Sequence, residues 1–174
     1  MMKHGFDMHR LFISGPGDLE RERDAVRTAI SEANAEDAMP HKILLVSAGL
    51  REDDQIVNFR AAVSQNVRDT EYYIQIFEDD WGPKNLFRKT FYLALECRDD
   101  AAMPMREVVV FLKNARPETD PEIIAFRDEL LQMQGIRLYQ FKTTAELGAQ
   151  MRELCALWVR DIQSQPVVEA EAQH

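Results

Sequence analysis

Short runs of apolar residues alternate along the chain with longer segments in which apolar residues recur every three or four positions. The short runs predict β-strands, and the longer periodic segments predict amphipathic helices. The expected strands cover residues 10–14, 42–47, 71–77, 107–112 and 136–141. The expected helices cover residues 18–35, 53–69, 84–96, 121–133 and 144–163. An expected helix follows each expected strand, and this alternation predicts an α/β protein.

Some of the expected strands are nearly continuous apolar runs, such as EVVVFL at 107–112. Strands of this kind are typical of a parallel sheet with helices on both faces. With right-handed crossovers, the strand–helix units predict a three-layer, flavodoxin-like sandwich with a five-stranded parallel sheet in the order 2-1-3-4-5. We expect residues 8–163 to form this single domain. Residues 164–174 are polar and acidic, and we expect a flexible C-terminal tail there.

The length of 174 residues suits one domain with its own hydrophobic core. The net charge is −9 and the pI is near 5.0, which argues against a nucleic-acid partner and against an anionic membrane surface. No apolar run reaches the ~18 residues of a membrane-spanning helix, and residues 1–10 contain no signal-peptide core. The sequence therefore predicts a cytoplasmic protein that binds neither nucleic acid nor membrane.

The cysteines and histidines indicate neither a metal site nor nucleophilic catalysis. Cys97 and Cys155 lie among apolar neighbours, far apart in sequence, and we expect buried, reduced thiols. The histidines show no metal-ligand spacing; they are His4, His9, His41 and His174. No nucleophile–histidine motif is visible, so an esterase or protease is not supported.

The loop after the first expected strand is one candidate site, because ligands of such sheets bind outside the carboxyl ends of strands 1 and 3. The GPG at 15–17 looks like a phosphate loop, but position 20 holds no glycine and no GK[ST] follows. We expect Asp18 to cap the next helix, and residues 20–24 to form a solvated face. Two interpretations stay open: a tight turn before a capped helix, or a loop that holds a flat ring or a sugar. The ligand-binding residues of the second interpretation are Ser14, Gly15 and Pro16.

The loop after the third expected strand is the other candidate site. Its acidic run, residues 78–80, could hold a magnesium ion or accept a phosphoryl group. Trp81 could stack on a base or a nicotinamide ring, or it could cover the core. Asn85 could bind a ribose or cap the next helix. The ligand-binding residues expected in this loop are Trp81, Gly82 and Asn85.

Three stretches resemble an uncharacterised family of bacterial TIR-like domains. The opening FISGPGDLERERDAV is similar to the family's first strand and helix, in which FISS or FISGP precedes DL and ERDAV. The stretches EYYIQIFEDDWGP and PMREVVVFLK resemble its third and fourth strands, and the likeness covers roughly residues 8–142. Members of this family often precede signalling NTPase or repeat modules. The resemblance therefore implies a flavodoxin-like (TIR-like) fold and a role in bacterial signalling.

The strand-1 ending FISGP is also similar to the Y-x-A-G-P of nucleoside deoxyribosyltransferases. Those enzymes and the TIR-domain NAD hydrolases cleave N-glycosidic bonds with a glutamate near the start of the helix after strand 3. The matching stretch here is TFYLA, in which Thr90 occupies the glutamate position. Its neighbours Arg88 and Lys89 are cations, and no glutamate lies between Asp80 and Glu96. An oxocarbenium-like centre needs a nearby anion, so the resemblance implies a domain that has lost this chemistry.

The sequence thus favours a non-catalytic or degenerate TIR-like module that senses a nucleotide or binds a protein. The expected ligand is a nucleoside or nucleotide such as NAD, and the expected protein partner is a signalling NTPase. One alternative is an active N-ribosyl hydrolase or transferase on NAD or nucleosides, with Asp79 or Asp80 as the catalytic carboxylate. A further alternative is a phosphorelay receiver-like domain, in which Asp79 or Asp80 would work with Lys142.

Overall fold

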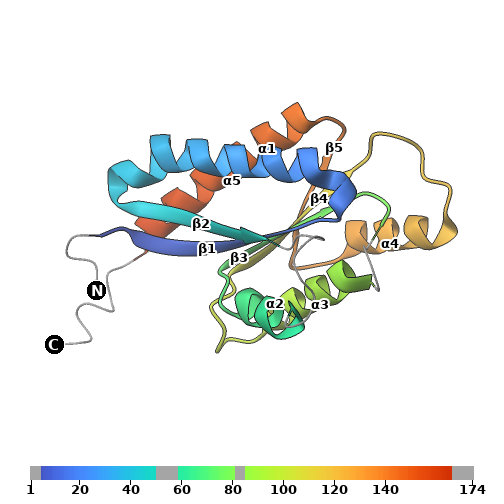
Figure 1. Cartoon of the computed structure of the whole chain (residues 1–174), viewed down its shortest axis with the longest axis horizontal. Coiled ribbons are helices and arrows are strands. Elements are labelled where there is room, and N and C mark those ends of the chain that lie inside the picture. The colour runs from blue at the N-terminus through green and yellow to red at the C-terminus, as the bar shows by residue number, and fades with distance from the viewer. Residues whose placement is uncertain (1–4, 50–58, 81–84, 166–174) are drawn as a thin grey trace.

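The computed structural model describes residues 5–49, 59–80 and 85–165. Its centre is a five-stranded, all-parallel sheet in the order β2-β1-β3-β4-β5 (Figure 1). The strands are β1 (Asp7–Ser14), β2 (Ile43–Gly49), β3 (Tyr72–Phe77), β4 (Glu107–Lys113) and β5 (Arg137–Phe141). This is the doubly wound, flavodoxin-like order expected from the sequence, and it confirms the predicted fold class.

Helices cover both faces of the sheet and complete the three layers (Figure 1). They are α1 (Glu20–Ala33), α2 (Phe59–Arg68), α3 (Leu86–Asp99), α4 (Pro121–Gln132) and α5 (Thr144–Gln163). Buried residues of α1 and α5 form one core cluster with one face of the sheet. Buried residues of α2, α3 and α4 form a second cluster with the other face.

The alternation of side chains along β3 explains why its sequence is apolar almost throughout. Tyr72, Ile74 and Ile76 belong to the core under α1 and α5, whereas Tyr73 and Phe77 belong to the core under α3 and α4. Successive side chains of a strand point to opposite faces, so a central strand with two covered faces has no solvent side. Cys155 lies in the first core and Cys97 in the second, and both are free thiols, as expected.

The two ends of α1 differ from the expected helix over 18–35. A 3₁₀ turn, Gly17–Leu19, comes before α1, and a π-helical turn, Asn34–Ala38, follows it. The side-chain amide of Asn34 donates to the Leu45 carbonyl at 2.9 Å and accepts from the Leu45 backbone N–H at 2.8 Å. These two hydrogen bonds connect the end of α1 to β2. The prediction that Asp18 caps the helix is wrong, because Leu19 occupies the cap position of α1 and Asp18 lies before it, inside the 3₁₀ turn.

Some of the expectations fall on parts of the chain that the structure does not describe. The first residues of the helix expected over 53–69, the loop residues Trp81 and Gly82, and the tail from residue 166 onward all lie outside the described residues. Within the described ranges, no helix is both long enough and apolar enough to cross a membrane.

Candidate functional site

The loops after β1 and β3 meet at the carboxyl edge of the sheet. Ser14, the last residue of β1, is in register with Gln75 of β3. This is the point where the strand order reverses, and doubly wound sheets bind their ligands there. The candidate site therefore contains the residues that follow these two strands, together with the helix ends beside them.

A buried arginine of α1 holds the FISGP loop by hydrogen bonds to its backbone. Arg23 donates to the carbonyl oxygen of Gly15 at 3.0 Å and also to that of Pro16. A Cβ atom on Gly15 would lie 3.4 Å from the Cβ of Ile76, so the loop rests directly on β3. Gly15 and Pro16 are themselves buried. These contacts favour the tight-turn interpretation of the loop over the ring-binding one.

The prediction of a solvated face over residues 20–24 is wrong for two of its members, Glu22 and Arg23, which are both buried. The missed signal was the helical period, because both residues lie one turn before the buried Val26. Glu22 instead accepts a hydrogen bond from Lys113 Nζ at 2.7 Å. This bond to Glu22 holds the pKa of Lys113 above its ordinary value, despite the opposing effect of burial.

Ser14 belongs to a buried polar group on the α3 side of the sheet. Tyr73 donates to Gln75 Oε1 at 2.8 Å, and Gln75 donates to the Ile76 carbonyl at 3.1 Å. The Ser14 hydroxyl is fully buried beside Tyr73. Burial raises the pKa of the neighbouring Tyr73 phenol, so the phenol stays a proton donor.

Thr90, which the sequence resemblance aligns with the glutamate of the deoxyribosyltransferases, is buried in α3 with 4% of its surface exposed. Its neighbours Phe87, Phe91 and Ala94 lie in the core on that face. A carboxylate at this position would be taken out of water, which is costly without a partner.

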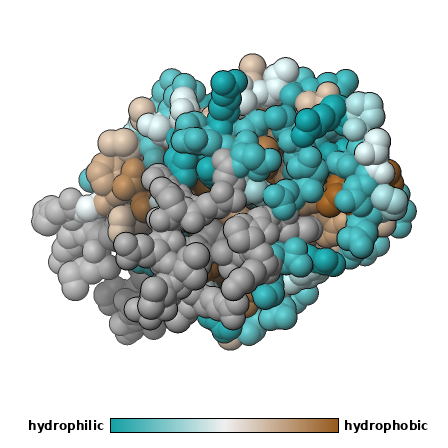
Figure 2. Space-filling model, turned by 45° about the vertical axis from the view of Figure 1, so that its right-hand side comes forward, coloured by the Kyte–Doolittle hydropathy of each residue, from teal (hydrophilic) through white to brown (hydrophobic). Residues whose placement is uncertain are grey.

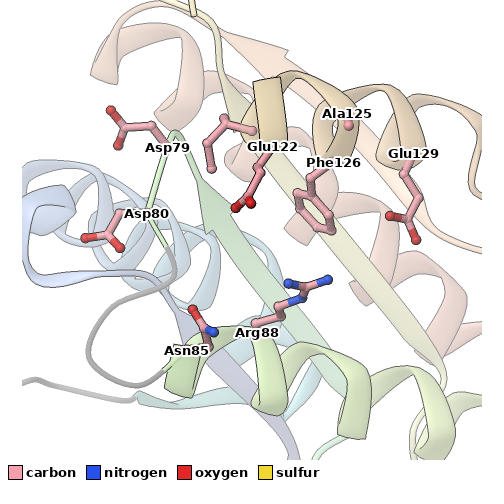
Figure 3. A pocket seen from close by; sticks show the side chains of 9 residues that line it. Asp79, Asp80, Asn85, Arg88, Glu122, Ala125, Phe126 and Glu129 are labelled. Atoms are coloured by element: carbon pink, nitrogen blue, oxygen red, sulfur yellow. The ribbon is translucent and has the colours of Figure 1, made fainter. Parts of the chain in front are cut away.

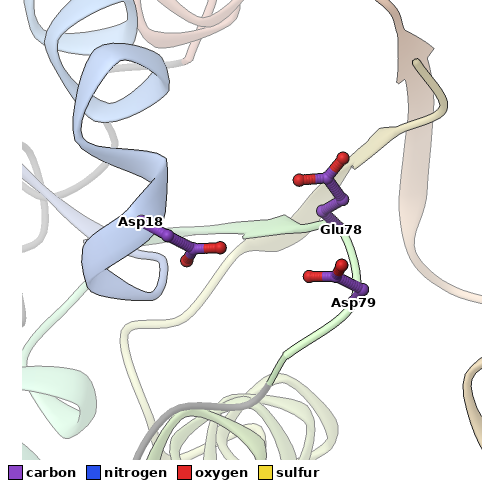
Figure 4. Close-up of side chains that lie close together, drawn as sticks. All are labelled: Asp18, Glu78 and Asp79. Atoms are coloured by element: carbon purple, nitrogen blue, oxygen red, sulfur yellow. The ribbon is translucent and has the colours of Figure 1, made fainter. Parts of the chain in front are cut away.

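Three carboxylates converge at the carboxyl edge (Figure 4). Asp18 comes from the 3₁₀ turn, and Glu78 and Asp79 follow β3 directly; one oxygen of each lies within 4.8 Å of the others. Burial raises the pKa of Glu78, as do the charges of Asp79 and Asp18, whereas Lys113 and Arg116 oppose the shift. We call Asp18, Glu78 and Asp79 the acidic trio.

Two arginines contact the Glu78–Asp79 side of the acidic trio. Arg116 forms ion pairs with Glu78 at 3.6 Å and with Asp79 at 3.3 Å. Arg127 of α4 donates to the carbonyl oxygens of Glu78 and Lys113, each at 2.9 Å, and so joins the ends of β3 and β4 to α4. No local sequence pattern points to either arginine, because both act across the edge of the sheet rather than along a helix.

A pocket of about 510 Å³ opens beside the trio, between α3 and α4 (Figure 3). It brings together three predicted site residues, Asp79, Asp80 and Asn85. Ser14, Gly15 and Pro16 do not line it. The remaining lining residues were not predicted: Arg88, Glu122, Ile123, Ala125, Phe126 and Glu129.

Asn85 occupies the cap position of α3 with a left-handed backbone, φ 55°, which asparagine tolerates better than most residues. Its side chain makes no cap hydrogen bond, so the capping interpretation is wrong. Lys142, the lysine of the receiver-like alternative, is exposed directly after β5.

Comparison with known proteins supports the fold but does not bear on function. No family model matches the sequence, and no curated protein matches it either. The metal-soaked Flv1 flavodiiron core from Synechocystis sp. PCC6803 superimposes with a TM-score of 0.50 at 8% identity, over 90% of this chain and 36% of that one. This chain thus spans about a third of that protein, and at such low identity the likeness shows the fold alone.

Two further solved structures are similar to the chain at lower TM-scores. A flavodoxin from the domain Archaea gives 0.48 at 9% identity, over 88% of this chain and 99% of that one. S. aureus homoserine dehydrogenase gives 0.42 at 14% identity, over 78% and 33% of the two chains.

Proposed function

We propose that this chain is a non-catalytic TIR-like domain that works by binding another protein at the carboxyl edge of its sheet. The observation that carries the proposal is the ion pairing of Glu78 and Asp79 with Arg116, at 3.6 and 3.3 Å. Two carboxylates beside the FISGP loop are thereby already committed to a cation. The expected signalling role and cytoplasmic location belong to the same proposal.

The pairing bears on catalysis because cleavage of an N-glycosidic bond needs an anion close to the sugar carbon. A guanidinium beside Asp79 competes with any developing positive charge for that carboxylate. The other position with a claim to the role holds Thr90, which is buried and carries no charge. Both facts support a domain without glycosidase activity.

The charge of this edge also favours a protein partner over a nucleotide. The acidic trio would repel the phosphates of NAD or of any nucleotide placed against it. The Gly15 carbonyl is occupied by Arg23, so the loop offers little backbone to a ligand. An uncharged nucleoside is the small molecule that this edge would tolerate best.

The test is turnover of NAD and of a nucleoside panel by the purified chain, followed by chromatography of nicotinamide and free bases. We expect no release above that of buffer alone. Release by the wild-type chain that disappears in Asp79→Asn or Asp80→Asn, with folding intact by circular dichroism, would overturn the proposal in favour of an N-ribosyl hydrolase or transferase.

A second candidate, the receiver-like domain, is favoured by the acidic trio itself. A magnesium-dependent phosphoacceptor site needs carboxylates from the ends of strands 1 and 3, and Asp18 and Asp79 meet there. Their oxygens are the donors that Mg²⁺ prefers, although Arg116 would have to give way. Phosphorylation by acetyl phosphate with Mg²⁺, abolished in Asp79→Asn, would support this candidate. An unmodified intact mass would remove it.

A further inference from the structure

The pocket between α3 and α4 has an acidic rim over an apolar floor. In Figure 3, Glu122 and Glu129 of α4 point into the space from one side, and Arg88 of α3 reaches in from the other. Phe126 lies between the two glutamates along α4 and is buried, with its ring edge-on to Phe77 at 5.2 Å. At about 510 Å³ the pocket falls within the range of ligand sites.

The two glutamates of this rim have no cationic partner in the part of the chain that the structure describes. Among the described residues, no lysine or arginine forms an ion pair with Glu122 or Glu129. Arg88 forms none within the same ranges, and its guanidinium lies over the Tyr92 ring at 5.8 Å. Two glutamates without an ion pair in the described ranges therefore face one guanidinium across the pocket, whereas Asp79, which also lines it, pairs with Arg116 at 3.3 Å. The unbalanced charge favours a cationic occupant and disfavours phosphates.

The shape of the pocket favours a side chain that arrives from another protein. Most of the lining residues are exposed; these are Asp80, Asn85, Arg88, Glu122, Ala125 and Glu129. A free small molecule is usually 70–90% or more buried by its site, and a pocket with so open a rim would leave it largely in water. A long basic side chain can lay its methylene stem on Phe126 and Ile123 while its charge meets the rim.

We propose that the α3–α4 pocket is the docking site for an arginine or lysine side chain on the surface of a partner protein. The proposal rests on the proposed function, because it names the kind of partner that the carboxyl edge binds. Much of the described surface in Figure 2 is hydrophilic, and on such a surface charge complementarity rather than a broad apolar contact would select the partner.

The test is the binding of a fluorescein-labelled octapeptide with two central arginines to the full chain, measured by fluorescence anisotropy. The pocket variant is the double substitution Glu122→Gln/Glu129→Gln. The matched control is Glu32→Gln/Glu153→Gln, which removes the same charge from exposed positions of α1 and α5. A peptide with glutamine in place of both arginines, and the free polyamine spermidine as a competitor, complete the design.

We expect the pocket variant to weaken peptide binding by about tenfold or more and the control by less than about twofold. Amide chemical shifts on addition of peptide should move over residues 122–129. Equal losses in the two variants would show general attraction to an acidic protein and would overturn the proposal. The glutamine peptide binding as tightly as the arginine peptide would also overturn it.

Three further outcomes show whether this inference or the proposed function fails. Spermidine could compete with the peptide at equal affinity, and its binding could weaken equally in the pocket variant. That result would mean that the pocket binds free cations and would overturn the docking assignment. Turnover of NAD or a nucleoside would instead overturn the proposed function, whichever way the peptide binds. No peptide binding and no turnover would overturn the inference alone.

Discussion

His9 Nδ1 lies 2.6 Å from Oε2 of Glu71, at the amino edge of the sheet and opposite to the candidate site. The other ring nitrogen lies 3.0 Å from Asp7 Oδ2, and the remaining oxygen of Glu71 lies 3.3 Å from Arg106. A neutral imidazole has only one N–H, so one carboxylate would face a ring lone pair. Only the protonated ring can donate to both carboxylates, and it thereby joins the starts of β1, β3 and β4.

This relationship predicts stability that falls as pH rises. Burial lowers the pKa of His9, but the bonds to Glu71 and Asp7 and their charges outweigh it, so the pKa lies above the ordinary 6.5. The folded state then binds the proton more tightly than the unfolded state does. The contribution is complete below about pH 6.5 and is lost as pH rises through the folded pKa, at no more than about 1.4 kcal/mol per pH unit.

Urea unfolding of the wild-type chain and of His9→Gln between pH 5.5 and 9 measures this contribution. The difference in unfolding free energy between the two chains should shrink as pH rises. His41→Gln, at an exposed position, is the control and should follow the wild-type curve. A difference that stays constant over the whole range would contradict the account.

The Arg23 contacts predict a large loss of stability when this side chain is removed. Arg23→Ala leaves the carbonyls of Gly15 and Pro16 without their buried donor, and we expect the free energy of unfolding to fall by about 2–3 kcal/mol. Arg27→Ala on the same helix removes only the pair with Asp24, at 3.2 Å, and should cost less than about 1 kcal/mol. Equal effects in chemical denaturation would argue against the packed loop.

The ion pair between Glu22 and Lys113 predicts that substitutions at these two positions have coupled effects on stability. Lys113→Met leaves the buried Glu22 carboxylate without its partner and should lower the free energy of unfolding by about 2–3 kcal/mol. Adding Glu22→Gln should recover part of that loss, because no buried charge is then left unpaired. A double-mutant cycle from urea unfolding measures the coupling, and additive losses would mean that the pair is not coupled.

The burial of Thr90 predicts that a glutamate at this position would destabilise the fold. Thr90→Glu places a carboxylate among Phe87 and Phe91, and we expect a loss of more than about 2 kcal/mol in unfolding free energy. Lys89→Glu puts the same group at an exposed neighbouring position and should change stability by less than about 0.5 kcal/mol. A stable Thr90→Glu chain would show that this position is open to the site.

The strands and helices could be predicted from the sequence because they depend on local patterns, and the strand order followed from the rule of right-handed crossovers. The run EVVVFL is nearly all apolar because β4 is covered on both faces, and each helix carries its own periodic face. The turn around Asp18 could not be predicted in this way. A 3₁₀ turn and a side-chain cap use the same residue types, and only the tertiary contacts of the loop decide between them.

The candidate site was only partly predictable for a related reason. Asp79, Asp80 and Asn85 follow β3 directly, so the rule of the carboxyl edge was enough to place them together. Arg116 and Arg127 reach the same edge from the segment after β4, and Glu122 and Glu129 come from α4. The spacing of these residues along the chain does not predict their contacts, because the contacts form only when the strands lie side by side.

The most direct test of the central claim is a time course of nicotinamide release from NAD by wild-type chain at high concentration, with the Asp79→Asn/Asp80→Asn chain in parallel. The account predicts that the two traces coincide with that of buffer, because Arg116 pairs with Asp79 and the position that the resemblance aligns with a catalytic glutamate holds the buried Thr90. Nicotinamide released by the wild-type chain and absent from the double variant would contradict it.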